Sequence, residues 1–480
     1  MGSDIAVIFP KWSRETYSHA LPPLGAMYIA SYLRCRGVHA KVIDCVADDL
    51  NPADVLKMIQ ALKPAYVGFS AMTCQLHDSI EISQQIKQWN PQITTVLGGP
   101  HIASTKEEIY QFTDTFDYLL DGEGESTLLD LVGGKAKHQI ASLIWKDGPK
   151  IVKNPLGGFM ENLDQLPYPD IDDIHIHRYH CAYTPTQTFM TMMATRGCPF
   201  KCSYCDAPVT MGKKLRKRSA ANVVDEIQYH QEKFGINTII FKDSTFTANK
   251  KFVHEICDEL MGRQVRVHWS CNTRVELVSD ELLEKMKAAG CYQIFYGIES
   301  GDQEVLNNYN KGNTLAEAEN AVRLTQKHRM KVTGYFMFGG FGENAEKAQK
   351  TINLAKRLDL DFATFGIVQA YPNTLIYFQA LREGIIDRHW YMHNQTGGLV
   401  CTNGFLNYPD FPPDKQRQML DKAIREFYMS PKYILKTLRT ITSWEDIKRV
   451  LRGALDVFNW TGIKNQTKNL LHSPLVAPAD

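Results

Sequence analysis

Short apolar runs alternate with longer amphipathic stretches through the first 135 residues. The intervening stretches with helical periodicity are Gly25–Arg36, Pro52–Leu62 and His77–Trp89, and the strand-like runs are Ile5–Phe9, Ala40–Asp44, Tyr66–Ser70 and Thr94–Leu97. This alternation predicts a doubly wound parallel sheet, so residues 1–135 are expected to form a Rossmann-like α/β domain. Ligands of such sheets lie off the carboxyl ends of the strands, which makes the loops after the strands the candidate binding residues.

A second alternation runs through residues 186–385. Helical periodicity is found in Asn222–Phe234, Lys250–Met261, Asp280–Ala289 and Thr314–His328. Strand-like runs are Phe189–Ala194, Thr238–Lys242, Val267–Asn272, Gln293–Gly297, Lys331–Phe338 and Phe362–Gln369. Six βα units predict a partial (β/α)6 barrel, in which the catalytic residues belong at the carboxyl ends of the strands.

The segment between these regions, residues 136–185, is predicted to be a linker. It contains a strand-like run at Ile140–Trp145 and a proline-marked stretch at Glu161–Asp170. Four of its side chains have the composition of a metal site but no clear common geometry, so we assign them a linker or surface role: His175, His177, His180 and Cys181.

Residues 386–480 are predicted to form a helical C-terminal domain. Pro412–Met429 is its clearest helix, and Pro431–Trp460 carries basic residues interleaved with aromatic ones. A solvated helical cap is favoured there over contact with a membrane surface or an acidic substrate. The polar tail from Gln466 onward is expected to fray.

Composition excludes several classes of protein. The 480 residues are 44% hydrophobic and 22% charged, which is ordinary for globular domains, and the net charge of +1 gives no reason to expect nucleic acid as a partner. No apolar run reaches the roughly 18 residues of a membrane span. The 11 cysteines are scattered rather than arranged as a disulfide framework, which favours the reducing cytoplasm.

The strongest chemical signal is the segment Cys198-Pro-Phe-Lys-Cys202-Ser-Tyr-Cys205, which follows the first strand of the predicted barrel. Three cysteines spaced C-x3-C-x2-C can bind three irons of a [4Fe–4S] cube and leave the fourth iron open to a ligand. A structural zinc site is the alternative, but zinc sites usually show paired cysteine or histidine sets, and no second pair lies nearby. The triplet therefore predicts an iron–sulfur cluster.

The triplet, with the aromatic Tyr204 directly before its third cysteine, resembles the motif of the radical S-adenosylmethionine (SAM) superfamily. The resemblance implies that SAM binds at the open iron, and that residues at the ends of the strands contact it. These candidates are Tyr204, Asp243, Arg274, Glu299, Ser300 and Gly339. Phe341 stands where the family has a proline, which weakens the assignment of the Gly339 loop. Taken singly, Asp243 or Arg274 is also compatible with a role in barrel stability, and Glu299 with a helix cap.

Loops of the first domain resemble the cobalamin-binding domain that precedes many radical SAM modules. Ser70 and Met72 followed by Gly98-Gly99 approximate the family pattern, and no G-x-G-x-x-G follows the first strand, which disfavours a dinucleotide. The resemblance implies that cobalamin contacts come from Leu24, Gly25, Ser70, Met72, Thr73, Gly98, Gly99, Pro100, His101, Gly122 and Glu123. The family's D-x-H-x-x-G pattern is absent, so cobalamin is expected without a lower axial histidine. Turns of a degenerate flavodoxin-like domain are the alternative.

Together, residues 1–385 resemble cobalamin-dependent radical SAM enzymes, most of which are methyltransferases. The resemblance implies a C-methyltransferase whose 5′-deoxyadenosyl radical activates a substrate carbon and whose methyl donor is methylcobalamin. It implies a small-molecule substrate, an electron donor such as flavodoxin or ferredoxin, and a C-terminal region that helps to shape the substrate pocket. No catalytic acid or base is assigned.

Three alternatives remain for the function. One is a radical cyclase or ring-rearranging enzyme with the same cofactors, and another is a cobalamin sensor whose barrel is inactive. The third is a tRNA methylthiotransferase, a family that needs three further N-terminal cysteines and a basic RNA-binding module. Cys35, Cys45 and Cys74 are present, but Cys74 lies within the cobalamin-like loop Ser70–Cys74 and the net charge of +1 does not suit RNA, so this alternative is disfavoured.

Overall fold

The computed structural model describes residues 4–11, 21–179, 181, 184–186, 188–392 and 404–439. Its N-terminal domain is a seven-stranded sheet in the order β2-β1-β3-β4-β5-β6-β7. The strands are β1 Ile5–Phe9, β2 Ala40–Asp44, β3 Tyr66–Ser70, β4 Thr94–Gly98, β5 Tyr118–Leu120, β6 Leu143–Asp147 and β7 Lys150–Lys153. The first five are parallel and the last two form an antiparallel extension. The order 2-1-3-4-5 is that of a doubly wound sheet, as the alternation predicted.

Within the described residues, four α-helices connect the parallel strands of this sheet, and a fifth, α5, connects β5 to β6. They are α1 Leu24–Arg34, α2 Pro52–Leu62, α3 Leu76–Trp89, α4 Pro100–Thr105 and α5 Gly124–Val132. The residues at the two ends of helix α2 explain where this helix begins and ends. Asn51 accepts a hydrogen bond from the Asp54 amide, Pro52 opens the first turn, and Lys63 ends the helix in the left-handed conformation at φ 49°. The predicted and observed bounds of this helix are the same.

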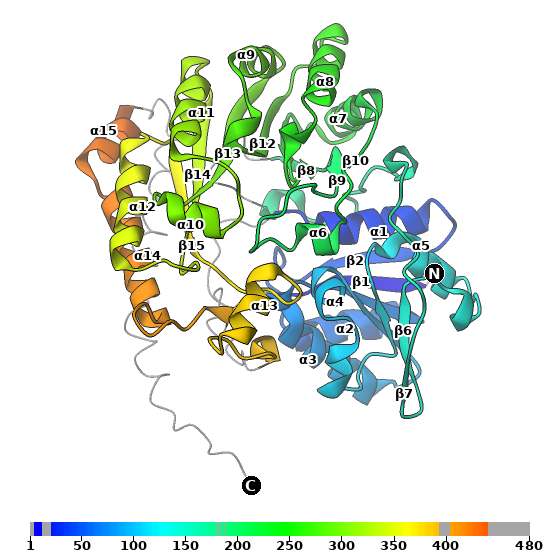
Figure 1. The fold of residues 1–480 in the computed structure, drawn as a ribbon. Coiled ribbons are helices and arrows are strands. Elements are labelled where there is room, and N and C mark those ends of the chain that lie inside the picture. Colours follow the sequence, from blue (N-terminus) through cyan, green and yellow to red (C-terminus); the bar gives the residue numbers. More distant parts are fainter. Residues whose placement is uncertain are drawn as a thin grey trace.

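The second domain is a curled parallel half-barrel with its strands in sequential order, β8-β11-β12-β13-β14-β15 (Figure 1). These are β8 Met190–Met192, β11 Thr238–Phe241, β12 His268–Arg274, β13 Cys291–Glu299, β14 Lys331–Phe338 and β15 Phe362–Ile367. The helices around it are α7 Ala220–Phe234, α8 Lys250–Gly262, α9 Asp280–Ala288, α10 Gln303–Asn308, α11 Leu315–Lys327 and α12 Ala345–Arg357. The observed architecture is the partial barrel that the six βα units predicted.

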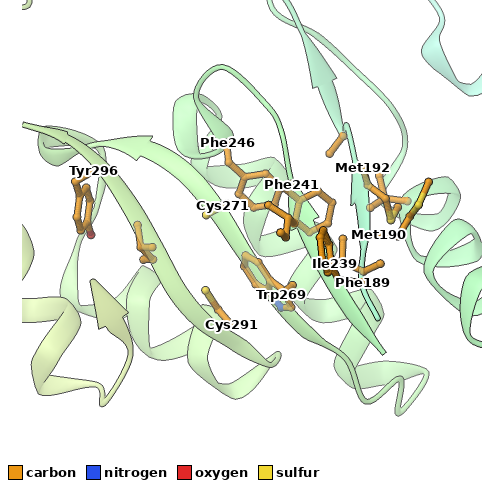
Figure 2. Packing of buried hydrophobic residues seen from close by; sticks show 14 of the residues in the cluster. Phe189, Met190, Met192, Ile239, Phe241, Phe246, Trp269, Cys271, Cys291 and Tyr296 are labelled. Atoms are coloured by element: carbon orange, nitrogen blue, oxygen red, sulfur yellow. The ribbon is translucent and has the colours of Figure 1, made fainter. Parts of the chain in front are cut away.

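Large side chains fill the space between the half-barrel and its helices. Phe241 and Trp269 meet edge to face with ring centroids 5.8 Å apart, and the Trp269 indole donates to the Ala289 carbonyl at 2.8 Å. Figure 2 shows this layer, with Met190, Met192 and Phe241 in the same packing. Because side chains alternate along a strand, the residues next to these point to the concave face of the sheet.

The connecting segments join the two domains. The linker strand predicted at Ile140–Trp145 begins later, as β6 at Leu143, because Ser142 has the left-handed φ of 64°, which interrupts extended backbone. The Nδ1 of His175 in the linker donates to the Asp48 carboxylate at 2.8 Å. Among the described residues, no three His, Cys, Asp or Glu side chains form a metal-binding group, and His180 lies outside the described residues.

Helices from the last part of the chain pack against both domains. They are α13 Leu375–Arg382, α14 Pro413–Tyr428 and α15 Pro431–Arg439. The Tyr428 hydroxyl donates to the Ala363 carbonyl at 2.7 Å, which attaches α14 to β15. In α15, Lys436 pairs with Asp361 at 3.2 Å. The rest of the predicted basic segment and the tail from Gln466 lie outside the described residues. Over the part of the chain that is described, no helix is long and apolar enough to span a bilayer.

Candidate cluster and cofactor site

The three cysteines lie on a loop that leaves the short strand β9 Thr195–Arg196 at the open end of the half-barrel. Gly197 starts the loop at φ 89°, and a Cβ there would lie 2.1 Å from the Lys214 carbonyl oxygen, so only glycine fits. The Cys198 amide donates to the Gly212 carbonyl at 3.0 Å. Cys198 is buried, whereas Cys202 and Cys205 are half-buried, and all three are free thiols. The loop therefore presents three thiols from one end of the barrel.

The three thiols are the donor set that a [4Fe–4S] cube takes, with each thiolate on a different iron, and ligation of the cluster by this triplet stays a prediction. Burial raises the pKa of the Cys205 thiol to about 12, so a thiolate at this position depends on the positive charge of bound iron.

Arg274 connects the end of β12 to the cluster loop. Its guanidinium donates to the Cys202 sulfur at 3.1 Å and lies over the Phe200 ring at 4.1 Å. It also donates to the Lys311 carbonyl and to the Glu276 carboxylate. Arg274, predicted to contact SAM, is therefore in contact with a cysteine of the triplet.

Beside Arg274 lies a buried group formed by Glu299, Lys311 and Tyr204. The Glu299 carboxylate accepts from the Lys311 ammonium at 2.8 Å and from the Tyr204 hydroxyl at 3.0 Å. A Cβ on Gly297 would lie 2.3 Å from the Glu299 carboxylate oxygen, so glycine leaves room for this pair. Burial and then the Glu299 charge raise the pKa of Tyr204, so its phenol keeps the proton that it donates. We call Arg274, Glu299, Lys311 and Tyr204 the edge group.

Lys311 is not among the residues that the sequence predicts to contact a cofactor. It lies between α10 and α11, in the segment Asn310-Lys-Gly-Asn313, where no periodicity marks it. Only the spatial approach of this turn to Glu299 reveals its role, since the two residues come from different elements.

The other three residues predicted to contact SAM have structural partners. Asp243 is 1% exposed and accepts from the Thr195 amide and hydroxyl, both at 2.6 Å, which holds the chain just before the cluster loop. Ser300 is fully buried and accepts from the Asp302 amide at 3.1 Å. Gly339 has φ 84° and faces Gln416, whose amide oxygen would lie 2.4 Å from an added Cβ. Their contacts with SAM stay predictions.

The loops predicted to bind cobalamin gather at one edge of the first sheet. Gly99 has φ 95°, and a Cβ there would lie 2.7 Å from the Ala71 amide nitrogen, so the loops after β3 and β4 touch through their backbones. A Cβ on Gly25 would lie 3.7 Å from the Ser70 hydroxyl, which places the start of α1 at the same edge. Gly25 and Pro100 are exposed, and Ser70, Met72 and Gly99 are half-buried. Small residues with accessible backbone fit a bulky cofactor at this edge.

Four of the predicted cobalamin residues are more enclosed, namely Leu24, Thr73, Gly98 and His101. Leu24 is 9% exposed and packs with Tyr28 and Tyr32 of its own helix. His101 is fully buried, and its Nδ1 lies 3.1 Å from the Thr73 hydroxyl oxygen. Burial lowers the pKa of His101 to about 3, so this imidazole is neutral.

Glu123 belongs to an ion-pair junction between the two domains. Its carboxylate lies 3.1 Å from Arg196 and 2.9 Å from Arg216, and Glu125 lies 2.7 Å from Arg196. All four side chains are at most 13% exposed. Because Arg196 directly precedes Gly197 and the cluster loop, this junction attaches the loop after β5 to the base of the cluster loop.

The cobalamin edge also contacts the cluster loop directly. Helix α4, which begins at Pro100 directly after Gly99, packs against α6 Ala207–Thr210, which begins two residues after Cys205. Figure 1 shows α6 between the half-barrel and the N-terminal domain, and α4 within the N-terminal domain. The edge predicted to hold one cofactor therefore faces the loop predicted to hold the other.

Comparisons with known families agree with this layout. Residues 192–355 match the radical SAM superfamily, and residues 14–132 match the B12 binding domain. The two matches fall on the half-barrel and on the N-terminal sheet.

Relatives match over almost the whole chain. An uncharacterized methyltransferase, PH0819 of Pyrococcus horikoshii, is 30% identical over 442 residues, which cover 91% of this chain and 94% of the relative. An anaerobic magnesium-protoporphyrin IX monomethyl ester cyclase of Rubrivivax gelatinosus is 27% identical over 470 residues, with 94% and 80% covered.

Solved structures have the same fold. The cobalamin-dependent SAM radical enzyme OxsB, solved with aqua-cobalamin bound, matches with a TM-score of 0.71 at 16% identity, covering 94% of this chain and 70% of OxsB. The cofactors of the chain are a [4Fe–4S] cluster, SAM and cobalamin. With both family matches in the expected order and a methyltransferase relative along nearly its full length, the chain belongs to the cobalamin-dependent radical SAM methyltransferase family.

Proposed function

We propose that this protein is a C-methyltransferase that transfers a methyl group to an unactivated carbon of a small-molecule substrate. When bound, SAM and the reduced cluster supply a 5′-deoxyadenosyl radical that removes a hydrogen atom from the substrate, and methylcobalamin supplies the methyl group. The electron for the cluster is proposed to come from a flavodoxin or a ferredoxin.

The contact between α4 and α6 is the observation that carries this proposal. It brings the loop after Gly99 against the segment after Cys205, which supports the proposal because a methyl donor and a radical source held by these two loops would lie close together. Holding two reactants in this way replaces an encounter between molecules by a step within one complex, which is where most of the catalytic gain of positioning comes from.

Different residues of the chain are proposed to position the cluster, SAM and cobalamin. Cys198, Cys202 and Cys205 are proposed to ligate the cluster. Arg274 and Lys311 of the edge group are proposed to hold the polar end of SAM beside it, since a guanidinium and an ammonium bind a carboxylate well. The loops after β3 and β4 would hold cobalamin, and the ion-pair junction fixes the distance between the two sites.

Ring formation is the second candidate function. The alignment covers 80% of the cyclase relative, and the name of that relative describes ring formation rather than methyl transfer. The two candidates differ in the fate of the methyl group rather than in the radical step.

The test uses anaerobically reconstituted protein with cobalamin, a reductant and SAM carrying a deuterated methyl group. A metabolite extract supplies substrates, and products are followed by mass spectrometry. We expect 5′-deoxyadenosine together with a new product heavier by one deuterated methyl group. Formation of 5′-deoxyadenosine with an unlabelled product would favour the cyclase, and no 5′-deoxyadenosine at all would leave only a cobalamin-binding role.

The cluster assignment has its own control. Cys202→Ala is expected to lose the iron–sulfur absorbance and the cleavage of SAM. Cys35→Ala is the matched variant because Cys35 is an exposed free thiol far from the loop in sequence, and it should keep both. Equal iron content in the two variants would contradict the assignment.

A further inference from the structure

The concave face of the half-barrel keeps accessible surface that neither cofactor assignment uses. Phe241, Trp269 and Cys271 pack toward the helices (Figure 2), so alternation turns Lys242 and Asn272 to the concave face. Phe241 pairs with Cys271 in the strand register, so the next residues, Lys242 and Asn272, lie beside one another. Lys242 is exposed and Asn272 is half-buried.

Strands β14 and β15 line the other side of this face. Tyr335, Met337 and Thr364 are half-buried there, although the neighbours that point toward the helices are buried. A Cβ added to Gly366, which pairs with Met337, would meet no atom within 4 Å. The concave face therefore holds open space beside the edge strand β15, whereas Phe295 of the central strand β13 is 4% exposed and stacks on Tyr335.

In the described part of the chain no carboxylate pairs with the Lys242 ammonium, and the titratable group that acts on it is the Cys181 thiol. No ion pair forms there, and the next residue, Asp243, turns away to bind Ala194 and Thr195. Surrounding protein lowers the pKa of Lys242 through desolvation, although the side chain is solvent-accessible. An accessible side chain that is nonetheless desolvated lies in a space enclosed by protein rather than on the outer surface. A bound anion stabilises a cation in such a space more than it stabilises a cation at an open surface.

Asn272 adds a second donor to this place. The Tyr335 hydroxyl donates to the Asn272 amide oxygen at 3.5 Å, which leaves the amide NH2 group as the donor next to Lys242. The ammonium and the amide together offer several N–H donors on the concave face beside β11 and β12. This set of donors suits a carboxylate or a phosphate.

The edge group lies nearer the cluster. Arg274 is two residues beyond Asn272 on β12, a rise of about 6.6 Å along the strand. The edge group already offers Arg274 and Lys311 to the carboxylate of SAM, so Lys242 is left for a different molecule.

We propose that Lys242 and Asn272 form the seat for an anionic group, a carboxylate or a phosphate, on the substrate that receives the methyl group. This inference rests on the proposed function. It narrows the substrate to a small molecule with an anionic group and places that group below the edge where SAM binds.

The test measures the labelling rate of Lys242 by an amine-reactive reagent, with cofactor-loaded protein and peptide mass spectrometry. Inorganic phosphate, benzoate and SAM are added separately, with chloride as the control for ionic strength. Lys251 is the matched lysine, because it is exposed at the start of α8. We expect phosphate or benzoate to slow labelling of Lys242 about twofold at a concentration equal to its dissociation constant, and to leave Lys251 unchanged.

Two variants separate the seat from a general charge effect. Asn272→Asp places a carboxylate beside the ammonium, so protection by phosphate and benzoate should disappear. Lys242→Met removes the cation and should leave SAM cleavage without substrate at the wild-type rate. The proposal is overturned if only SAM protects Lys242, if no anion protects it, or if Lys242→Met abolishes SAM cleavage. None of these results bears on methyl transfer itself, which the deuterium experiment measures.

Discussion

Arg196 is the residue whose loss should weaken the junction between the domains most. It lies 2.7 Å from Glu125 and 3.1 Å from Glu123, and its side chain is 7% exposed. Replacement by methionine keeps much of the volume and removes the charge. Glu123 retains Arg216 at 2.9 Å, whereas Glu125 loses its ion-pair partner in a buried position.

The expected cost follows from that orphaned carboxylate. Removing one partner of a buried pair costs about 3–5 kcal/mol, and we expect Arg196→Met to fall near the lower end because Glu123 stays paired. Burial alone would raise the pKa of Glu125, but Arg196 lowers it below the ordinary value. The pair therefore stabilises the fold above the ordinary carboxylate pKa, and this stabilisation is lost as the pH falls through the lowered value. The difference between wild type and variant should shrink in acid.

The assay is urea denaturation under anaerobic conditions, followed by circular dichroism. Glu125→Gln in the Arg196→Met background should recover part of the loss, because a neutral amide replaces the unpaired charge. Arg263→Met is the matched control, since Arg263 pairs with Glu259 and Asp225 on the outer surface and should cost at most about 1 kcal/mol. The reasoning is refuted if Arg196→Met costs no more than the control, or if Glu125→Gln brings no recovery.

Three further predictions concern the half-barrel. Arg274→Gln should shift the cluster midpoint potential to more negative values in a redox titration followed by EPR, because the N–H donated to the Cys202 sulfur at 3.1 Å stabilises the reduced state; an unchanged potential would contradict this. Gly366→Leu should fill the open concave face and abolish product formation while 5′-deoxyadenosine is still made; unchanged turnover would show that the substrate lies elsewhere. Burial raises the pKa of Glu343 to about 8, so its ionisation should cost stability progressively from about pH 4.5 to pH 8, and Glu343→Gln should remove this slope from urea midpoints measured across that range.

The elements of the fold were predictable because their signals are local. The bounds of α2 and β14 agree with the periodicity at Pro52–Leu62 and Lys331–Phe338. The motif order also places the cysteine triplet and the Gly98-Gly99 turn at strand ends, where the structure has them.

Side-chain partners were less predictable because they depend on contacts between distant segments. Glu123 lies in a loop typical of cofactor binding, yet its carboxylate pairs with arginines 73 and 93 residues later in the chain, Arg196 and Arg216. Lys311 reaches Glu299 only through the turn between α10 and α11. Neither pairing leaves a pattern in the sequence, since an ion pair requires only opposite charges that the fold brings together.

The charged side chains that the fold encloses differ in how far they are neutralised. At the junction, Arg196 and Arg216 face Glu123 and Glu125. In the edge group, Lys311 faces Glu299. Lys242 has no carboxylate partner in the described part of the chain, and desolvation lowers its pKa although its side chain is solvent-accessible. A desolvated charge without a partner raises the free energy of the folded protein, so binding of an anion beside it is more favourable. Asn272, the neighbour of Lys242 in the proposed seat, lies about 6.6 Å from Arg274 along β12, so a bound anionic group would be held at a fixed distance from the edge group.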